Sequence, residues 1–179
     1  MIKNNLLNIE SLIARLGLEQ GFRVADLGCG AFGYFTFLLA KFVGKSGKIY
    51  AVDIIKDSLE AIKKRARIEN LSQIETIWSD LEVVGGANIK SDSLDSVLLI
   101  NVLHQSEKKI NILKECMRIL KPGGKVLLVE WNEKDSPFIL SSVNKVSRDE
   151  IKRLSSFLNI KIEDEFQAGE YHYGMLLSK

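Results

Sequence analysis

The stretch Val24–Gly33, which reads VADLGCGAFG, decides the fold of this chain. The apolar residues Phe22–Leu27 that lead into it predict a short buried strand, and the apolar run Phe35–Val43 that follows predicts a helix. The three glycines of the stretch let the backbone turn tightly and approach a ligand closely, while the helix would direct its first amide donors at that ligand. The stretch therefore predicts a strand, a ligand-binding turn and a helix in succession.

Strand-like and helix-like segments alternate from this stretch to residue 131. Such alternation is typical of an α/β fold, in which crossover helices cover both faces of a parallel sheet. Before the glycines, an amphipathic pattern predicts a helix at Leu6–Leu16. After them, we expect strands at Lys48–Asp53, Ile74–Trp78, Leu94–Ile100 and Lys125–Trp131, and helices at Leu59–Ile68 and Ile110–Leu120.

The pattern changes near the end of the chain. Ser147–Glu150 is a capping box, which predicts a helix that runs to Leu158. Two strand-like segments follow, Ile160–Phe166 and Tyr171–Leu177, and the four residues between them are too few for a parallel crossover. They predict an antiparallel hairpin, so that the sheet has seven strands and is mostly parallel. On the last strand His172 faces opposite to its neighbours, which indicates one face in water.

Length and composition indicate one globular domain over residues 1–179, with 46% apolar and 27% charged residues. The net charge of +2 excludes the strongly basic surface of a dedicated nucleic-acid binder. Cys29 and Cys116 are far apart, so we expect neither a disulfide framework nor a metal site. No apolar run approaches the ~18 residues of a membrane span, and Met1–Glu10 does not read as a signal peptide. We therefore expect a cytoplasmic protein.

Acidic side chains end the second and third predicted strands. Asp53 follows Gly33 by 20 positions, and a carboxylate there can accept both hydrogen bonds of a ribose diol. Capping of the next helix is the alternative role for Asp53. Asp80 would lie at the same sheet edge, where it can accept a hydrogen bond from an amino group such as that of adenine. A solvated loop acid is the alternative for Asp80.

Five motifs occur in a fixed order: VADLGCG, YAVDI, WSDL, SLDSVLLINVLHQ and LKPGGKVLLVEW. Together they make the chain resemble the class I S-adenosylmethionine-dependent methyltransferases, in particular the small-molecule group that includes the ubiquinone and menaquinone C-methyltransferases. The resemblance covers Phe22–Trp131, and the predicted hairpin extends it to Lys179. It implies a Rossmann-like fold, S-adenosylmethionine as cofactor, S-adenosylhomocysteine as product and an unidentified small molecule as methyl acceptor.

The resemblance also implies where the cofactor lies. The methionine part would lie along the glycine loop and near Asn101, the ribose at Asp53, and the adenine beside the ends of the second and third strands. Cys29 would be a small side chain that fits the turn rather than a reactive thiol. The cofactor-binding residues expected on this basis are Asp26, Gly28, Cys29, Gly30, Asp53, Ile54, Asp80, Leu81 and Asn101.

The glycine loop departs from the family pattern. That pattern reads G-x-G-x-G, but Phe32 stands where its third glycine would fall, and the glycine is Gly33. Read literally, Gly28, Gly30 and Gly33 match the G-x-G-x-x-G fingerprint of dinucleotide-binding proteins. A NAD-dependent oxidoreductase is therefore an alternative. Against it, the Asp26 carboxylate would repel a pyrophosphate, and the chain has no room for a separate substrate domain.

No catalytic constellation stands out in the sequence. Methyl transfer is an in-line displacement, so the protein needs only to align the acceptor, exclude water and, where required, take a proton. His104 is a candidate base, with packing or helix capping as the alternative. Glu130 and Trp131 end the fifth strand and are expected to face the acceptor, with a loop anchor and core packing as their alternatives.

Two segments can add walls for an acceptor, namely a helix within residues 1–20 and the polar segment 132–147, which would act as a lid. Because both are short, we expect a site that is shallow, open or completed by a second subunit in a homodimer. The basic run Lys63–Arg67 spreads over the solvent side of a helix, which disfavours a nucleic-acid substrate. The lack of a clear base leaves one more alternative, a non-catalytic S-adenosylmethionine-binding or interaction protein.

Overall fold

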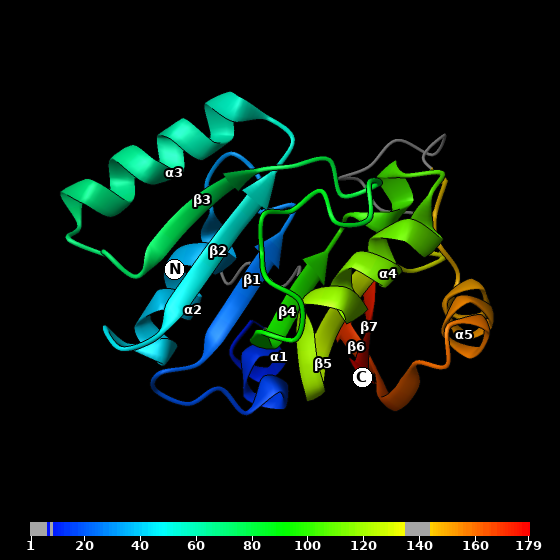
Figure 1. Cartoon of the computed structure of the whole chain (residues 1–179). Helices are drawn as coiled ribbons and strands as arrows, with labels where there is room; N and C mark the ends of the chain where they lie inside the picture. The colour runs from blue at the N-terminus through cyan, green and yellow to red at the C-terminus, as the bar shows by residue number, and fades with distance from the viewer. Residues whose placement is uncertain (1–6, 8, 135–143) are drawn as a thin grey trace.

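The computed structural model describes residues 7, 9–134 and 144–179. These residues form a seven-stranded sheet with helices on both faces (Figure 1). None of the described helices combines the length and the apolar character needed to cross a membrane. The elements in chain order are α1 (Ile9–Leu16), β1 (Arg23–Leu27), α2 (Tyr34–Val43), β2 (Lys48–Asp53), α3 (Lys56–Ile68), β3 (Ile74–Trp78), β4 (Leu94–Ile100), the 3-10 helix η1 (Leu103–Gln105), α4 (Lys109–Ile119), β5 (Leu120–Trp131), α5 (Arg148–Phe157), β6 (Lys161–Gly169) and β7 (His172–Ser178).

The strands of the sheet follow the order β3-β2-β1-β4-β5-β7-β6. The first five strands of the chain pair in parallel, whereas β7 pairs antiparallel with both β5 and β6. The predicted mostly parallel sheet with a C-terminal antiparallel hairpin is therefore confirmed. The order of strand addition reverses between β1 and β4, and open α/β sheets bind their ligands at the carboxyl ends of the strands beside such a switch point.

Three details differ from the sequence predictions. α4 ends at Ile119, and Leu120 already pairs with Leu94, so the Pro-Gly-Gly segment is an irregularity within β5. The hairpin strands extend to Gly169 and from His172, which leaves a shorter connection than expected. The expected wet face of the last strand is wrong: β7 lies inside the sheet and is buried along its whole length, because apolar layers cover both of its faces.

The helix predictions agree more closely with the structure. The Ser147 hydroxyl accepts a hydrogen bond from the Glu150 amide at 3.1 Å, which confirms Ser147 as the N-cap of α5 and one of the two bonds of the predicted capping box. α3 begins at Lys56, slightly ahead of the expected start. α1 begins at Ile9, and the residues of the expected N-terminal helix before position 7, together with Asn8, lie outside the described residues.

Two apolar layers enclose the sheet. Leu12 of α1 and Leu39 of α2 belong to the layer on one face, and Leu113 of α4 and Ile151 of α5 belong to the layer on the other. All four side chains are at most 2% exposed. Full burial of one such side chain contributes about 1.5–3 kcal/mol to folding. The layers therefore hold the strands, and the loops at their ends, in a defined arrangement.

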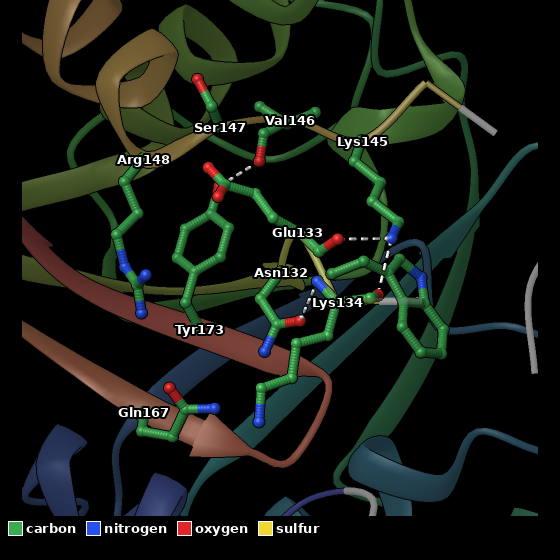
Figure 2. Close-up of a pocket in the computed structure, with 10 residues that line it drawn as sticks. Asn132, Glu133, Lys134, Lys145, Val146, Ser147, Arg148, Gln167 and Tyr173 are labelled. Carbon is green, nitrogen blue, oxygen red and sulfur yellow. Dashed lines mark hydrogen bonds between the residues drawn. The ribbon is translucent and has the colours of Figure 1, made fainter. Parts of the chain in front are cut away.

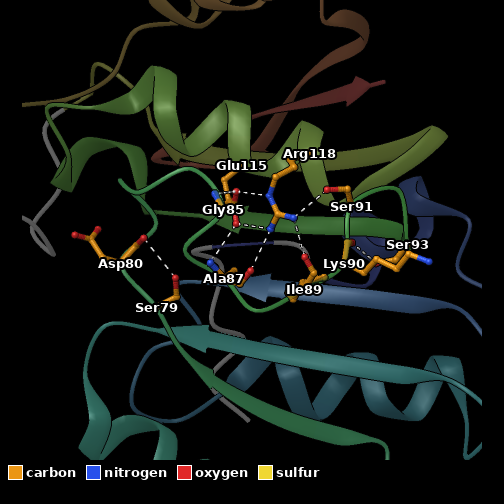
Figure 3. Close-up of polar contacts among 10 residues, drawn as sticks. All are labelled: Ser79, Asp80, Gly85, Ala87, Ile89, Lys90, Ser91, Ser93, Glu115 and Arg118. Atoms are coloured by element: carbon orange, nitrogen blue, oxygen red, sulfur yellow. Dashed lines mark hydrogen bonds and ion pairs between the residues drawn. The ribbon is translucent and has the colours of Figure 1, made fainter.

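A buried ion pair ties the segment between β3 and β4 to α4 (Figure 3). The fully buried Glu115 carboxylate accepts hydrogen bonds from the amides of Gly85 (2.7 Å) and Ala87 (3.2 Å) and from Arg118 Nε (2.8 Å). Arg118 in turn donates to the carbonyl oxygens of Ala87 and Ile89. Burial acts to raise the pKa of Glu115, but the bonds from Arg118 and the two amides outweigh it and hold that pKa below its usual value.

We expect Glu115→Gln to lower the free energy of unfolding by about 3 kcal/mol, because the amide leaves the Arg118 charge and a backbone amide without their acceptor. Urea unfolding monitored by circular dichroism measures the change. Glu60→Gln is the matched control, since the Glu60–Lys63 pair is exposed and separated by 3.8 Å, and it should cost less than about 1 kcal/mol. Equal effects of the two substitutions would contradict the anchoring role of Glu115.

Candidate functional site

A cavity of about 480 Å³ lies at the carboxyl ends of β1, β2, β3 and β4, a size within the usual range of small-molecule sites. The ends of these strands and the segments that follow them supply most of its walls, and Ile112 of α4 adds to them. Six of the nine expected cofactor-binding residues line it, whereas Asp26, Cys29 and Asn101 do not. The lining residues are Gly28, Gly30, Asp53, Ile54, Ile55, Ser79, Asp80, Leu81, Glu82, Val102, Gln105, Ser106 and Ile112.

The glycine loop forms one wall, and its glycines are there for two different reasons. Gly28 has φ of 74°, and a Cβ on it would lie 2.5 Å from Val102 Cγ2, so β1 and the end of β4 approach too closely for a side chain. Gly30 has φ of 65°, but nothing lies within 4 Å of where its Cβ would be. The Val102 side chain therefore fills the space beside Gly28, whereas the space next to Gly30 is free of protein atoms.

The amide donors of this loop are directed into the protein. The amides of Gly28 and Cys29 donate to the Val52 carbonyl oxygen at 2.8 and 3.1 Å, and the Gly30 amide donates to Asp53 Oδ2 at 2.9 Å. These three loop amides therefore bind the loop to β2. The sequence prediction that the first amides of the following helix point at a ligand concerns α2, which begins at Tyr34, and stays a prediction.

The extra residue of the loop is accommodated at its outer end. Phe32 is 84% exposed, so its side chain occupies no part of the loop interior. Gly33 precedes α2 with φ of 52°, and a Cβ on it would lie 2.8 Å from Ile62 Cγ1 of α3. The absence of a side chain at Gly33 therefore allows α3 to pack against the start of α2. The extra residue does not displace Gly28 and Gly30 from the cavity wall.

Asp53 joins the glycine loop to the start of α3. Its side chain is 8% exposed; Oδ2 accepts from the Gly30 amide and Oδ1 from the Ile55 amide, both at 2.9 Å. The bond from the Ile55 amide closes a turn ahead of α3, but Ile55 itself is the N-cap of that helix and no side chain caps it, so the capping alternative for Asp53 is wrong. A carboxylate oxygen can accept more than one hydrogen bond, so Asp53 keeps acceptor capacity toward the cavity that it lines.

Asp26 lies beneath the glycine loop with 3% exposure. Its Oδ2 accepts a hydrogen bond from Thr36 Oγ1 at 2.6 Å. Burial raises the pKa of Asp26 to about 6, despite the opposing effect of the bonds from Thr36. Burial also raises the pKa of the Cys29 thiol, with the carboxylates of Asp26 and Asp53 adding to the shift. The thiol form of Cys29 is therefore favoured, which disagrees with a reactive cysteine.

The opposite wall follows β3. Asp80 Oδ1 accepts from the Glu82 amide at 2.9 Å, which closes a tight turn and directs Leu81 into the apolar core. Glu82 accepts from Ser106 Oγ at 2.7 Å and pairs with Lys108 at 3.3 Å. Three carboxylates thus line the cavity, and no Lys or Arg occurs among its described lining residues.

Asn101, His172 and Trp131 form a chain of contacts beside this cavity. Asn101 has φ of 56°, and its side-chain nitrogen lies 3.1 Å from Nε2 of His172. His172 is 1% exposed, and its ring centroid lies 4.0 Å from that of Trp131. Sequence reasoning assigned no role to His172. The order of β5 and β7 in the sheet brings it to the site, and periodicity along a single strand carries no such signal.

His104 and Glu130 form a second pair at the end of β5. Glu130 is fully buried; its Oε1 accepts from the Leu103 amide at 2.6 Å, and its Oε2 lies 2.9 Å from Nδ1 of His104. The carboxylate therefore anchors η1, the loop-anchor alternative, instead of facing the cavity. The His104 side chain retains 12% exposure.

A smaller cavity of about 240 Å³ adjoins the end of β5 (Figure 2). Trp131 lines it, and so does Tyr173, whose hydroxyl donates to the Val146 carbonyl oxygen at 2.8 Å. Lys145 donates to the carbonyl oxygens of Glu133 and Lys134 on the opposite side. The expected lid at 132–147 borders this cavity, and its residues 135–143 lie outside the described part of the chain.

Several lining residues were missed by the sequence analysis. Ile55 and Ser79 flank predicted positions, and their place directly after β2 and β3 is the signal that could have found them. Val102, Gln105 and Ser106 follow β4, and the first two lie in the motif SLDSVLLINVLHQ, which gave the same signal.

Comparison with known proteins gives a family match over most of the chain. Residues 18–171 match the family described as Methyltransferase domain. The demethylmenaquinone methyltransferase of Lactococcus lactis subsp. lactis (strain IL1403) is 32% identical over 123 residues, which cover 69% of this chain and 47% of that protein. The protein of the same name from Geobacillus sp. (strain WCH70) is 27% identical over 124 residues, covering 69% of this chain and 51% of that protein. This chain thus spans about half the length of the curated relatives that it matches.

Solved structures share the fold at low sequence identity. A SAM dependent methyltransferase from Aquifex aeolicus aligns with a TM-score of 0.86 at 21% identity, covering 97% of this chain and 90% of that one. The [4+2]-cyclase SpnF aligns with a TM-score of 0.80 at 14% identity, and the alignment covers 95% of this chain and 78% of that one. These likenesses concern the fold alone. The match over residues 18–171 shows that the chain belongs to the methyltransferase domain family, and its fold is that of the S-adenosylmethionine-dependent methyltransferases.

Proposed function

We propose that this chain transfers a methyl group from S-adenosylmethionine to a small-molecule acceptor. The observation that carries the proposal is the charge of the larger cavity. Asp53, Asp80 and Glu82 line it, and its described lining residues include no Lys or Arg. The cofactor of this family carries a net positive charge from its sulfonium and ammonium groups, and an acidic cavity attracts a cation through its overall field. Glu82 contributes less to that field, because it pairs with Lys108 at 3.3 Å.

The same features argue against a dinucleotide. A dinucleotide site binds the pyrophosphate through backbone amides of the glycine loop as well as those of the helix that follows it, but the loop amides of Gly28, Cys29 and Gly30 already donate to β2. The pyrophosphate would also lie near the carboxylates of Asp26 and Asp53. We therefore infer that the literal G-x-G-x-x-G match has no role in nucleotide binding.

We assign the nucleoside part of the cofactor to the β2 and β3 side of the cavity. The ribose hydroxyls would donate to Asp53, because each of its oxygens accepts one backbone amide and has a further lone pair. The adenine would pack against Ile54 and Leu81, with Asp80 near its amino group. Ile54 is 56% exposed in the described structure, so it has apolar surface to cover.

We assign the methionine part to the glycine loop and the end of β4. The open space above Gly30 gives room for it. Asp26 would attract its ammonium group from beneath the loop, and Cys29 would support the turn. The buried Oδ1 of Asn101 has no hydrogen-bond partner among the described residues, and it would accept a bond from a cofactor donor.

When bound, the cofactor supplies an electrophilic methyl group, so the chain needs no covalent nucleophile. Its own residues would bind the acceptor, orient it and exclude water. We propose Trp131 as a wall of the acceptor site and the segment 132–147 as its lid, within one domain. We also propose a cytoplasmic location, which the two free, buried cysteines favour.

Titration calorimetry with S-adenosylmethionine, S-adenosylhomocysteine and NADH tests the cofactor. We expect micromolar binding of the first two and no binding of NADH, and binding of NADH alone would contradict the proposal. Demethylmenaquinone, which the names of the curated relatives contain, is the first acceptor to try, in its reduced form and with methyl-labelled cofactor. Cofactor binding without transfer to any acceptor in a broad panel would favour a non-catalytic protein, and SpnF shows that this fold also occurs in a protein named for another reaction.

Asp53→Ala is expected to weaken S-adenosylhomocysteine binding by about 1–3 kcal/mol, roughly 5–150-fold in Kd, because two ribose hydroxyls and two loop amides lose their acceptor. Calorimetry at constant pH measures the change. Asp57→Ala, in the exposed first turn of α3, is the control and should leave Kd within about twofold. An unchanged Kd in the Asp53 variant would rule out the ribose assignment.

Asp26→Asn is expected to stabilise the protein while weakening cofactor binding. The pKa of Asp26 rises from 3.8 to about 6 on folding, so the stability that its protonated form contributes is present below about pH 4 and is lost as pH rises through about 6. At about pH 7.5 the substitution should therefore raise the free energy of unfolding by up to about 3 kcal/mol, and by nothing at about pH 4. Urea unfolding at both pH values measures this, and a gain independent of pH would contradict it.

A further inference from the structure

The two edges of the sheet are built differently. β6 forms one edge, with four charged residues and two irregularities in its pairing with β7. β3 forms the other edge. Over Ile74–Trp78, Glu75 is its only charged residue, and it has neither a proline nor a break in its pairing with β2. Charges, prolines and bulges are the devices that keep an edge strand from pairing with other chains. β3 therefore lacks most of the protection that β6 has.

The backbone of β3 presents unpaired groups along this edge. The Ile49 amide of β2 donates to the Gln73 carbonyl oxygen at 2.8 Å, so every second residue from Gln73 onward faces β2. Ile74, Thr76 and Trp78 therefore direct their backbone groups away from the sheet. Apart from the Ile74 amide, which closes a turn at 3.2 Å, these groups have no hydrogen-bond partner among the described residues. The edge thus offers amide donors and carbonyl acceptors in alternation.

A groove of about 750 Å³ lies beside this edge, between β3 and α3. Residues 74–76 line it from the strand, and Lys63 and Arg67 line it from the helix. α3 carries five basic and two acidic residues. The one carboxylate among the described lining residues, that of Glu75, already pairs with Lys48 at 2.8 Å. The helix wall of the groove is therefore cationic.

The chemistry of the edge and the groove selects among possible occupants. An extended peptide backbone has both donors and acceptors to match the edge, whereas the phosphates of a nucleic acid only accept hydrogen bonds. A second copy of this chain at the same edge would bring two α3 helices together, and their excess positive charges would repel. Acidic side chains over the groove would instead be attracted. These features favour a peptide strand with acidic side chains on one face.

We propose that β3 is a docking edge for an extended, acidic segment of another protein, which adds to the sheet as an eighth strand. Backbone bonds to the outward groups of Thr76 and Trp78 would supply affinity, and the groove would select acidic side chains at every second position, over Lys63 and Arg67. The inference goes beyond the proposed function and does not depend on it, because it involves neither the cofactor nor the acceptor.

A short alternating peptide, acetyl-GEVEVEVEG-amide, is the probe for this edge. Fluorescence polarisation of its labelled form with the full chain measures Kd, and amide hydrogen exchange followed by NMR locates the binding. We expect saturable binding, and exchange at Thr76 and Trp78 at least about tenfold slower in the complex. A peptide with lysine in place of every glutamate is expected not to bind.

Two N-methylated forms of the peptide separate strand addition from attraction between charges. One carries methyl groups on its glutamate amides, the other on its valine amides, and both keep the charge of the parent. Alternate amides of a strand face opposite sides, so only one of the two sets faces β3. We expect one form to bind at least about tenfold more weakly than the parent and the other to bind within about twofold of it, because a methylated amide cannot donate.

Substitutions on α3 test the cationic wall. Lys63 and Arg67 are both exposed, so Lys63→Gln and Arg67→Gln should leave the fold intact. Each is expected to weaken peptide binding by about three- to tenfold. Lys64→Gln is the matched control, since it removes the same charge from an exposed position of α3 that does not line the groove, and it should change Kd by less than about twofold.

Four results would overturn the proposal. The first is no binding of the parent peptide at about 1 mM. The second is equal binding of the two methylated forms, which would leave charge alone as the cause. The third is displacement of the peptide by a single-stranded RNA oligomer that itself slows exchange at Thr76, which would assign the edge to nucleic acid. The fourth is a dimer of the free chain, seen by light scattering, in which the Thr76 amide is already protected.

Discussion

The Asp53 carboxylate connects three parts of the site. It ends β2, accepts the Gly30 amide from the glycine loop and accepts the Ile55 amide at the start of α3, all with 8% exposure. Because both bonds lie at the carboxyl end of the sheet, the loop after β1 and the loop after β2 are held at a fixed separation. The bonds to Asp53 therefore hold the cavity between the two loops in shape without a ligand. The same Asp53 carboxylate contributes to the negative charge of the cavity. Preformed sites avoid the entropy cost of ordering loops on binding.

The sequence was sufficient to predict the sheet and one side of the site. Strand ends are marked by Asp53 and Asp80, and parallel strands bring their carboxyl ends to one edge. Gly28, Gly30, Asp53 and Asp80 could therefore be named from order and spacing, whereas Ile54 and Leu81 came from the resemblance to the methyltransferases. The sequence could not show that the loop amides donate to β2, since that depends on the separation of β1 and β2. The position of the extra loop residue could not be predicted either, because it depends on the contact between α2 and α3. In the structure the Phe32 side chain is exposed and Gly33 lies beside Ile62.

The side of the site beside β5 and β7 was harder to predict, because it depends on contacts between distant segments. β7 inserts beside β5, which brings His172 to Asn101 and to Trp131. Glu130 was expected to face the acceptor, but burial inside the sheet directs it to η1 and to His104. Alternation along one strand predicts which residues share a face, and it does not predict which loop covers that face. The charge of the cavity and the orientation of His104 are therefore findings of the structure.

The account depends most directly on where the cofactor binds. A crystal structure of the chain with S-adenosylhomocysteine measures this in one experiment. We expect the ribose hydroxyls within hydrogen-bond distance of Asp53, the adenine between Ile54 and Leu81, and the methionine part over Gly30 toward Asn101. Density for the ligand at another surface, or a nucleoside turned away from Asp53, would contradict the account.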